Sequence, residues 1–116
     1  MEQLFLARDG RIVAASVRRA TTLWARLRGL IGRPRPPGEA LLLEPAKQIH
    51  TWGMRYPIDV LFCDRRRRVV RVLRSVSPRR MTPFVPSARC VLELEAGAAR
   101  GVVEGDELLI RQSSGP

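Results

Sequence analysis

The chain has 116 residues, a length that suits one domain and allows a core to be buried without disulfide staples. Hydrophobic residues make up 45% and charged residues 28% of the chain, which are values of a globular protein and exclude a disordered one. No apolar run approaches the ~20 residues of a membrane helix, so we expect no membrane span. The first ten residues lack the form of a secretory signal. We therefore expect one domain over residues 1–116, located in the cytoplasm.

The formal net charge is +10, and Lys47 is the only lysine among the basic residues. A basic surface attracts nucleic acid, anionic lipid or acidic proteins. The arginines are scattered, with one dense run at Arg65 to Arg68. Aromatic residues make up only 5% of the chain, which does not predict a stacking platform for single strands. The charge therefore leaves the class of partner open.

The N-terminal part predicts a β-hairpin and then a helix. Asp9-Gly10 separates apolar runs at about 2–7 and 11–17, a strong hairpin signal. After a threonine that can cap a helix, apolar residues recur at helical spacing and end before Gly32 and Pro34. The residues of this predicted main helix are Thr21 or Thr22 at the cap, then Leu23, Leu27, Leu30 and Ile31.

The rest of the chain reads as short strands separated by turns. The predicted strands cover residues 40–44, 58–63, 69–76, 88–95 and 107–111, with Asp64 to Arg67 as the turn of a second hairpin. The segment 77–87 contains three prolines and is expected to be an irregular loop, and Gly97 to Gly101 a turn or short helix. The fold class expected is α+β, mostly β: a small barrel-like β domain with one main helix and short helical turns.

The stretch from Ile49 to Phe62 concentrates rare side chains, including the only His, His50, and the only Tyr. An imidazole serves as acid, base, metal ligand or hydrogen-bonding group. Three roles for His50 stay open: a structural one, contact with a ligand, or metal binding. A single His cannot build a multi-His zinc site, and we expect no metal and no cofactor.

Two further groups in this stretch are candidates for ligand binding. Trp52 and Met54 flank Gly53, which suits an apolar lid over a ligand or, alternatively, a plug at one end of the core. Asp59 stands among apolar residues, where an unpaired carboxylate is costly. We expect it to meet backbone amides or an arginine, with Arg26 a plausible partner, or to act as a general base if it is free at a pocket.

Other reactive side chains favour structural interpretations. Glu93 and Glu95 share one face of a predicted strand, which we interpret as solvated rather than as a glycosidase pair. Cys63 and Cys90 follow no metal spacing and are interpreted as buried thiols; a disulfide requires their strands to be neighbours, and the expected compartment argues against one. No Ser-His-Asp or Cys-His set can be assembled from the sequence.

Several separated motifs together resemble the family known as Domain of Unknown Function 192, over residues 20 to 109. The helical segment from Ala20 to Leu30 is similar to its Arg-x-Gly-Leu element. Trp52 to Phe62 is similar to its Trp-Met, Pro-x-Asp and apolar-strand block. Val91 to Gly97, with Gly105-Asp106, is similar to its closing Leu-Glu-x-x-x-Gly and Gly-Asp elements. The resemblance implies a compact, β-rich, barrel-like fold with one or two short helices, and no established activity.

The chain also departs from that family's pattern. Gly53 separates Trp52 from Met54, and the Asn-Thr pair that usually follows is missing. The turn after the central strand is a run of arginines rather than acidic or Gly-containing. A ligand that depended on the Asn would be bound differently by this chain.

Three hypotheses follow. The first is a non-enzymatic binding or accessory module for an unknown small molecule or protein, with its surface around residues 49–59 and candidate residues His50, Trp52, Met54, Asp59 and Arg26. The second is a small hydrolase or metal-dependent enzyme that uses His50 with a carboxylate. The third is nucleic-acid association through the arginines.

Overall fold

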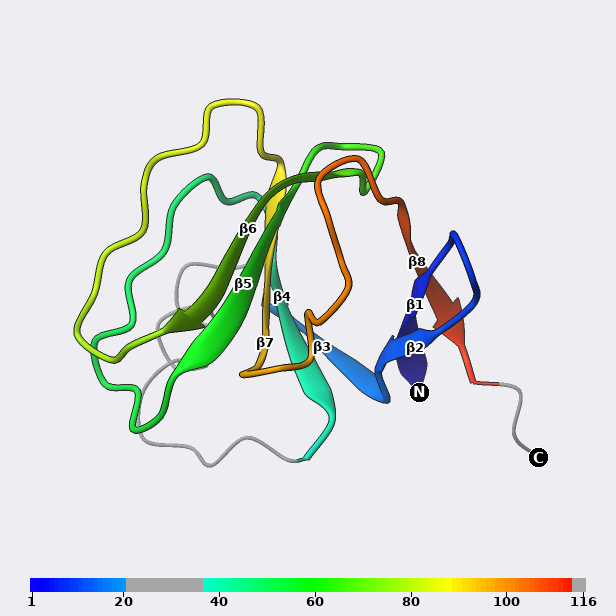
Figure 1. Cartoon of the computed structure of the whole chain (residues 1–116), viewed down its shortest axis with the longest axis horizontal. Coiled ribbons are helices and arrows are strands. Elements are labelled where there is room, and N and C mark those ends of the chain that lie inside the picture. The colour runs from blue at the N-terminus through cyan, green and yellow to red at the C-terminus, as the bar shows by residue number, and fades with distance from the viewer. Residues whose placement is uncertain (21–36, 114–116) are drawn as a thin grey trace.

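A computed structural model describes residues 1–20 and 37–113, and this part of the chain folds into two β-sheets. The smaller sheet has the order β2-β1-β8 and the larger one β3-β4-β7-β5-β6 (Figure 1). The strands are β1 (Glu2–Leu6), β2 (Ile12–Ala14), β3 (Ser16–Ala20), β4 (Glu39–Leu43), β5 (Ile58–Cys63), β6 (Val69–Val76), β7 (Cys90–Glu95) and β8 (Leu108–Gln112).

Both predicted hairpins are confirmed. β1 and β2 pair antiparallel across the Asp9-Gly10 turn, and β5 pairs antiparallel with β6. The second turn is shaped by Asp64, whose Oδ1 accepts the backbone N–H groups of Arg66 at 2.8 Å and Arg68 at 3.0 Å. An aspartate that bonds amides two and four residues ahead closes a tight turn, so the four arginines there do not prevent it.

One predicted strand, residues 11–17, is divided between the two sheets. β2 ends at Ala14, β3 begins at Ser16, and the chain turns a corner at Ala15. The Ala15 N–H donates to the Gly38 carbonyl at 2.8 Å, and a Cβ on Gly38 would lie 3.3 Å from that of Ala15. Gly38, with φ of 77°, therefore permits the close approach that lets β3 run parallel to β4 in the larger sheet.

The expected fold class is wrong for the described residues, which are all-β, with no helix. The expected main helix, residues 21–31, lies outside them. The described residues form no closed barrel either, because their strands are divided between two sheets and each sheet keeps two edge strands. Residues 96–101 form successive turns rather than a helix, since Gly97 and Gly101 adopt φ of 93° and 79°, which interrupt helical geometry.

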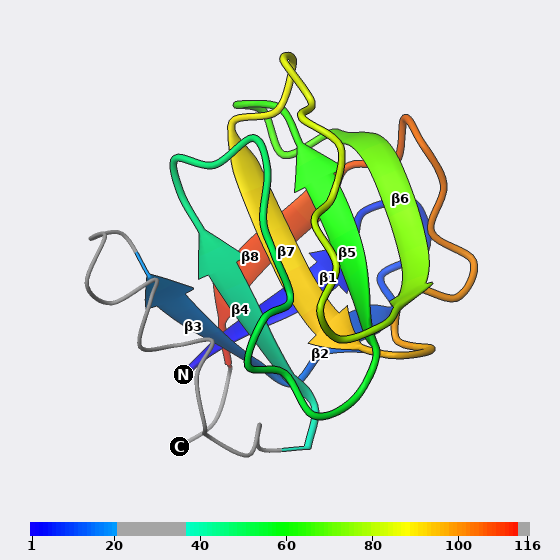
Figure 2. The same cartoon turned by 90° about the vertical axis from the view of Figure 1, so that its left-hand side faces the viewer.

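The larger sheet is covered on both faces, and its strands alternate between two hydrophobic cores. Leu42, Leu61 and Leu92 face the smaller sheet, whereas Leu41, Phe62 and Val91 face the opposite side. There, the loops before β5 and before β7 cross in front of the sheet (Figure 2). The expected solvated face of β7 is therefore wrong for Glu93, which is fully buried.

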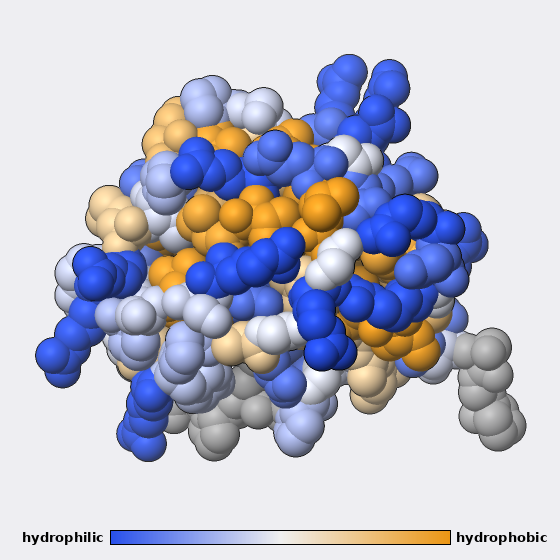
Figure 3. All heavy atoms as spheres, viewed as in Figure 1, coloured by the Kyte–Doolittle hydropathy of each residue, from blue (hydrophilic) through white to orange (hydrophobic). Residues whose placement is uncertain are grey.

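β6 forms one edge of the larger sheet and carries the exposed arginines Arg71 and Arg74. The Arg74 guanidinium donates to the carbonyls of Ala99 at 2.5 Å and Val102 at 2.6 Å, which ties the segment after β7 to this strand. On this side, hydrophobic surface is crossed and bordered by hydrophilic side chains (Figure 3). Charges placed in this way protect an edge strand from pairing with another chain.

Asp106 joins the N-terminal hairpin to the turn before β8, and its side chain is only 7% exposed. It accepts hydrogen bonds from Arg8 at 3.0 and 3.2 Å and from the Val103 amide at 2.9 Å. The bonds from Arg8, followed by the one from the Val103 amide, lower the pKa of Asp106 below its ordinary value of 3.8. The folded chain therefore binds this proton more weakly than the unfolded chain does.

A carboxyl whose pKa is lowered by folding stabilises the protein fully above its ordinary pKa and loses this contribution as the pH falls through the folded pKa. We expect the free energy of unfolding of Asp106→Asn to fall less steeply below pH 3.8 than that of the wild type. Urea denaturation at a series of acidic pH values measures the slope. Glu104→Gln, at an exposed neighbouring carboxyl, is the control and should keep the wild-type slope.

Candidate functional site

Two long loops pair with each other to form what we call the loop ribbon, residues 46–54 and 77–89. Backbone N–H groups donate across it from Ala46 to Arg89, from Val85 to Lys47, from Thr82 to Ile49 and from Thr51 to Arg80, at 2.8 to 3.0 Å. His50 and Met81 form an antiparallel bridge between them. The ribbon thus has the geometry of a short two-stranded sheet, although neither loop contains a regular strand.

Two buried threonines hold the ribbon from inside. The Thr51 hydroxyl donates to the Ser77 carbonyl at 2.8 Å and accepts the Arg80 N–H at 2.8 Å. The Thr82 hydroxyl accepts the Ile49 N–H at 3.0 Å and lies 3.2 Å from the Ile49 carbonyl. With exposures of 1% and 4%, both side chains bond backbone groups of the paired loops, and Thr82 provides the partner of the buried Ile49 N–H.

The two sides of the ribbon differ in chemistry. Its inner side sends Ile49, Val85 and Ala88 into the core against β5 and β7. Its outer side exposes Trp52 by 50%, Met81 by 63% and Phe84 by 59%. These are three of the six large hydrophobic side chains that are exposed in the described part of the chain. An apolar group held in solvent on paired loops is typical of a recognition surface.

His50 and Trp52 come together on the outer side, where the sequence places both as candidates. Their rings meet edge to face with centroids 5.8 Å apart, and the backbone N–H of Trp52 donates to His50 Nδ1 at 3.2 Å. The imidazole thus helps to orient the indole. The ligand-contacting role expected for the pair stays a prediction.

The other candidates lie elsewhere. Met54 is half-buried and packs against the core beneath the ribbon. Asp59 is 1% exposed, on the face of β5 that points away from the ribbon. Arg26 lies outside the described residues.

The Asp59 carboxylate is occupied by backbone amides. Oδ1 accepts the Ser75 N–H at 2.9 Å, and Oδ2 accepts those of Gly97 at 2.9 Å and Ala99 at 3.0 Å. The sequence predicts backbone amides or an arginine as partners of Asp59, and these are backbone amides. A hollow of about 400 Å³ adjoins Asp59 and is lined by residues that include Arg74 and Arg100. With three amides on its oxygens, the carboxylate is arranged to hold a loop rather than to accept a substrate proton.

Met81 and Phe84 were missed by the sequence analysis, which treated residues 77–87 only as an irregular loop. A signal was present: both stand between prolines in a stretch with no apolar periodicity, so no regular element would bury them. Their partners on the other loop are fixed only by long-range pairing.

The loops of the ribbon also lack negative charge. No Asp or Glu occurs in residues 45–58 or in residues 65–92. Arg55, Arg79 and Arg80 are all exposed there. The apolar outer side is therefore accompanied by positive charges without an intervening carboxylate, and its potential favours an anionic partner.

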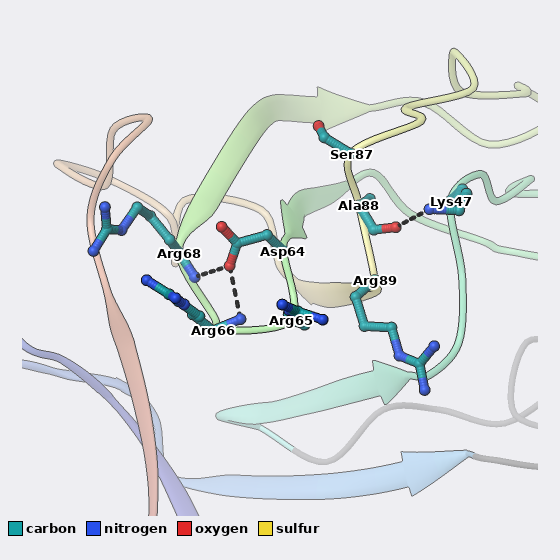
Figure 4. A pocket seen from close by; sticks show the side chains of 8 residues that line it. All are labelled: Lys47, Asp64, Arg65, Arg66, Arg68, Ser87, Ala88 and Arg89. Atoms are coloured by element: carbon teal, nitrogen blue, oxygen red, sulfur yellow. Dashed lines mark hydrogen bonds between the residues drawn. The ribbon is translucent and has the colours of Figure 1, made fainter.

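A basic cleft of about 470 Å³ lies at the end of the ribbon that is nearer to the β5–β6 turn. It is lined by Lys47, Asp64, Arg65, Arg66, Arg68, Ser87, Ala88 and Arg89 (Figure 4). The Lys47 ammonium donates to the carbonyls of Pro86 at 2.6 Å and Ala88 at 2.5 Å. The cleft therefore gathers five cationic side chains around one carboxylate.

The single carboxylate of the cleft is committed to the turn. Two hydrogen bonds lower the pKa of Asp64 below its usual range: the one from the Arg68 amide has the larger effect, and the one from the Arg66 amide adds to it. Among residues 1–20 and 37–113, the side chains of Arg65, Arg66, Arg68 and Arg89 donate no hydrogen bond. Their donors are available to an anion.

In the described part of the chain, no three His, Cys, Asp or Glu side chains gather to hold a metal ion. No helix there is long and apolar enough to cross a bilayer.

Two solved structures share this fold. A protein of unknown function from Novosphingobium aromaticivorans DSM 12444 is similar with a TM-score of 0.77 and 20% identity, over 93% of this chain and 82% of that one. A candidate transcription regulator from Sinorhizobium meliloti 1021 gives a TM-score of 0.71 and 24% identity, over 93% of this chain and 90% of that one. No curated protein sequence matches the chain. The model of the family DUF192, described as an uncharacterized ACR, matches residues 4–110, further toward the N-terminus than the motifs alone indicate, and the chain therefore belongs to this family.

Proposed function

We propose that this chain is a non-enzymatic binding module that captures an acidic protein segment with apolar side chains on the outer side of the loop ribbon. The observation that supports it most is the exposure of Trp52, Met81 and Phe84 on loops that are otherwise firmly paired. Aromatic and methionine side chains that are buried on binding dominate the energy of many protein interfaces. A ribbon held by internal hydrogen bonds loses little conformational entropy on association.

The acidic character of the partner follows from the charges around this surface. Both loops are free of carboxylates; Arg79 and Arg80 are exposed on one of them, and Arg55 is exposed directly after the other. Carboxylates on a partner would meet these guanidinium groups at the rim, while its apolar side chains cover the indole and its neighbours. Charges at a rim set the association rate and the choice of partner more than the affinity.

Hydrolysis by His50 with a carboxylate is less well supported. No hydrogen bond joins His50 to a carboxylate within the described residues, and its Nδ1 accepts the Trp52 amide. Asp59 faces the other side of the larger sheet with both oxygens bonded. General acid–base chemistry requires the two groups to reach one substrate.

Nucleic-acid association is a second candidate, favoured by the basic cleft. Its arginines come from the β5–β6 turn and from the residue before β7, and they present unbonded donors of the kind that contact phosphates. One protein with this fold is named a candidate transcription regulator. This function would act through the cleft and not through Trp52, so variants can separate the two candidates.

The test uses arrays of synthetic peptides built from Glu and apolar residues, with matched arrays in which Gln or Lys replaces each Glu. We expect the wild type to bind the Glu arrays selectively, and Trp52→Ala or Met81→Ala to weaken binding by about tenfold or more. Ile12→Ala is the matched control, because Ile12 is 53% exposed on β2 of the smaller sheet. It should leave binding unchanged.

A fluorescent single-stranded oligonucleotide serves as the second probe. Three results together would favour the nucleic-acid candidate. Oligonucleotide binding would fail in the Arg65→Gln/Arg66→Gln/Arg68→Gln variant, persist in Trp52→Ala and fall steeply with salt. Equal peptide binding by Trp52→Ala and Ile12→Ala would overturn the protein-binding proposal.

A further inference from the structure

Cys63 and Cys90 lie directly opposite each other in neighbouring strands. Cys63 ends β5, Cys90 begins β7, and the two are paired in the antiparallel register of these strands. Both are free thiols with 0% exposure, and both belong to the core that faces the smaller sheet. The expectation of buried thiols is confirmed. A disulfide also requires the two cysteines to lie on neighbouring strands; the sequence left this condition open, and the structure meets it.

The geometry of such a pair suits a covalent bond. Directly opposite residues of an antiparallel pair have Cα atoms about 4.5–5.5 Å apart, within the range of disulfides at about 4.4–6.8 Å. Both residues lie at an end of their strand: Cys63 is next to the turn at Asp64, and Cys90 is next to the loop that ends at Arg89. A small approach of two strand ends disturbs the sheet less there than in its middle.

Charged groups distinguish the two sulfurs. Arg67 Nη1 lies 3.6 Å from Cys90 Sγ and 3.9 Å from Glu44 Oε2, with its own side chain 22% exposed. The hydrogen bond from the Cys63 thiol, with help from Arg67, lowers the pKa of Cys90, while that same bond and burial raise the pKa of Cys63. Cys90 therefore has the greater thiolate character of the two.

We infer that Cys63 and Cys90 form a modification site at which a small hydroperoxide produces a reversible intramolecular disulfide. The Cys90 thiolate attacks the peroxide, the O–O bond breaks, and the leaving oxygen takes up a proton as water, or as an alcohol from an organic peroxide. The Cys63 sulfur then attacks the resulting Cys90 sulfenic acid, and its S–O bond breaks to release water with the Cys63 proton. Two electrons pass from the thiols to the peroxide.

This site directly adjoins two residues that line the basic cleft and is independent of the proposed binding function. Cys63 directly precedes Asp64, and Cys90 directly follows Arg89, both of which line the cleft. A bond between the sulfurs would fix the two segments that carry the cleft's arginines relative to each other. Oxidation would thereby act on the part of the surface best suited to anions.

The test treats the reduced chain with hydrogen peroxide, then unfolds it in the presence of an alkylating reagent and measures the intact mass. We expect a monomer that is lighter by two hydrogen atoms, takes up no alkyl group and regains two alkylation sites after dithiothreitol. Cys63→Ser should trap a sulfenic acid that dimedone labels, whereas Cys90→Ser should be labelled at least about tenfold more slowly.

Dialkylated protein after exhaustive peroxide treatment, or disulfides only between chains, would overturn the inference. The wild-type measurement decides this even if a serine variant fails to fold. Equal labelling of the two folded variants would refute the assigned order of attack. Loss of peptide or oligonucleotide binding leaves this result unaffected, so the two proposals fail separately.

Discussion

Replacing Asp59 with alanine is expected to lower the free energy of unfolding by about 3–5 kcal/mol. The carboxylate is 1% exposed and joins three backbone amides from two separate segments, at Ser75 and at Gly97 and Ala99. Its loss leaves three donors without this acceptor, of which the Ala99 amide is buried, and removes the link that holds the turn after β7 against β5. Urea denaturation followed by circular dichroism measures the change.

Asp9 is the matched control for this prediction. It also accepts a backbone amide, that of Arg11 at 3.0 Å, but its side chain is 49% exposed. Water can replace the lost acceptor there, and Asp9→Ala should cost less than about 1 kcal/mol. If both variants lose the same stability, the bonds to Asp59 are not what secures the turn.

Removing the two hydroxyl groups inside the loop ribbon is expected to have the next largest effect. The double variant Thr51→Val/Thr82→Val keeps the shape of both side chains but leaves the backbone groups of Ile49, Ser77 and Arg80 without their partners. We expect a loss of about 2–4 kcal/mol in stability and faster amide hydrogen exchange confined first to residues 46–54 and 77–89.

The conservative control is Thr51→Ser/Thr82→Ser, which retains both hydroxyls. It should keep slow exchange in the ribbon and lose stability only by the two missing methyl groups. If binding by the outer side depends on a rigid ribbon, the valine variant should also bind the Glu peptides more weakly than the serine variant does. Unchanged exchange in the valine variant would show that the backbone pairs alone hold the loops.

The strands of the larger sheet could be predicted because their signals are local. Ile58–Cys63 and Val69–Val76 have the predicted bounds, since apolar β-branched runs with an aspartate turn between them determine a hairpin over short distances. The corner at Ala15 could not be predicted, because it depends on contact with Gly38. Local patterns likewise could not show that the smaller sheet and the larger one would stay open.

The candidate site was predictable in part. Crowding of rare residues indicated His50 and Trp52, which do meet on the outer side of the ribbon. The amides that Asp59 binds belong to residues 75, 97 and 99, and the bridge from His50 reaches Met81. Such partners are distant along the chain. The sequence indicates that a buried carboxylate needs hydrogen-bond partners, but it does not indicate which residues provide them.

The alternation of β4, β5 and β7 between two cores has a consequence for how the protein unfolds. Because successive residues such as Leu61 and Phe62 serve opposite cores, neither core can melt while the other persists. Unfolding of the described residues should be one cooperative transition, in which the central amides exchange only through the fully opened state. Any ligand held on one side of this sheet would then slow exchange on the side it never touches.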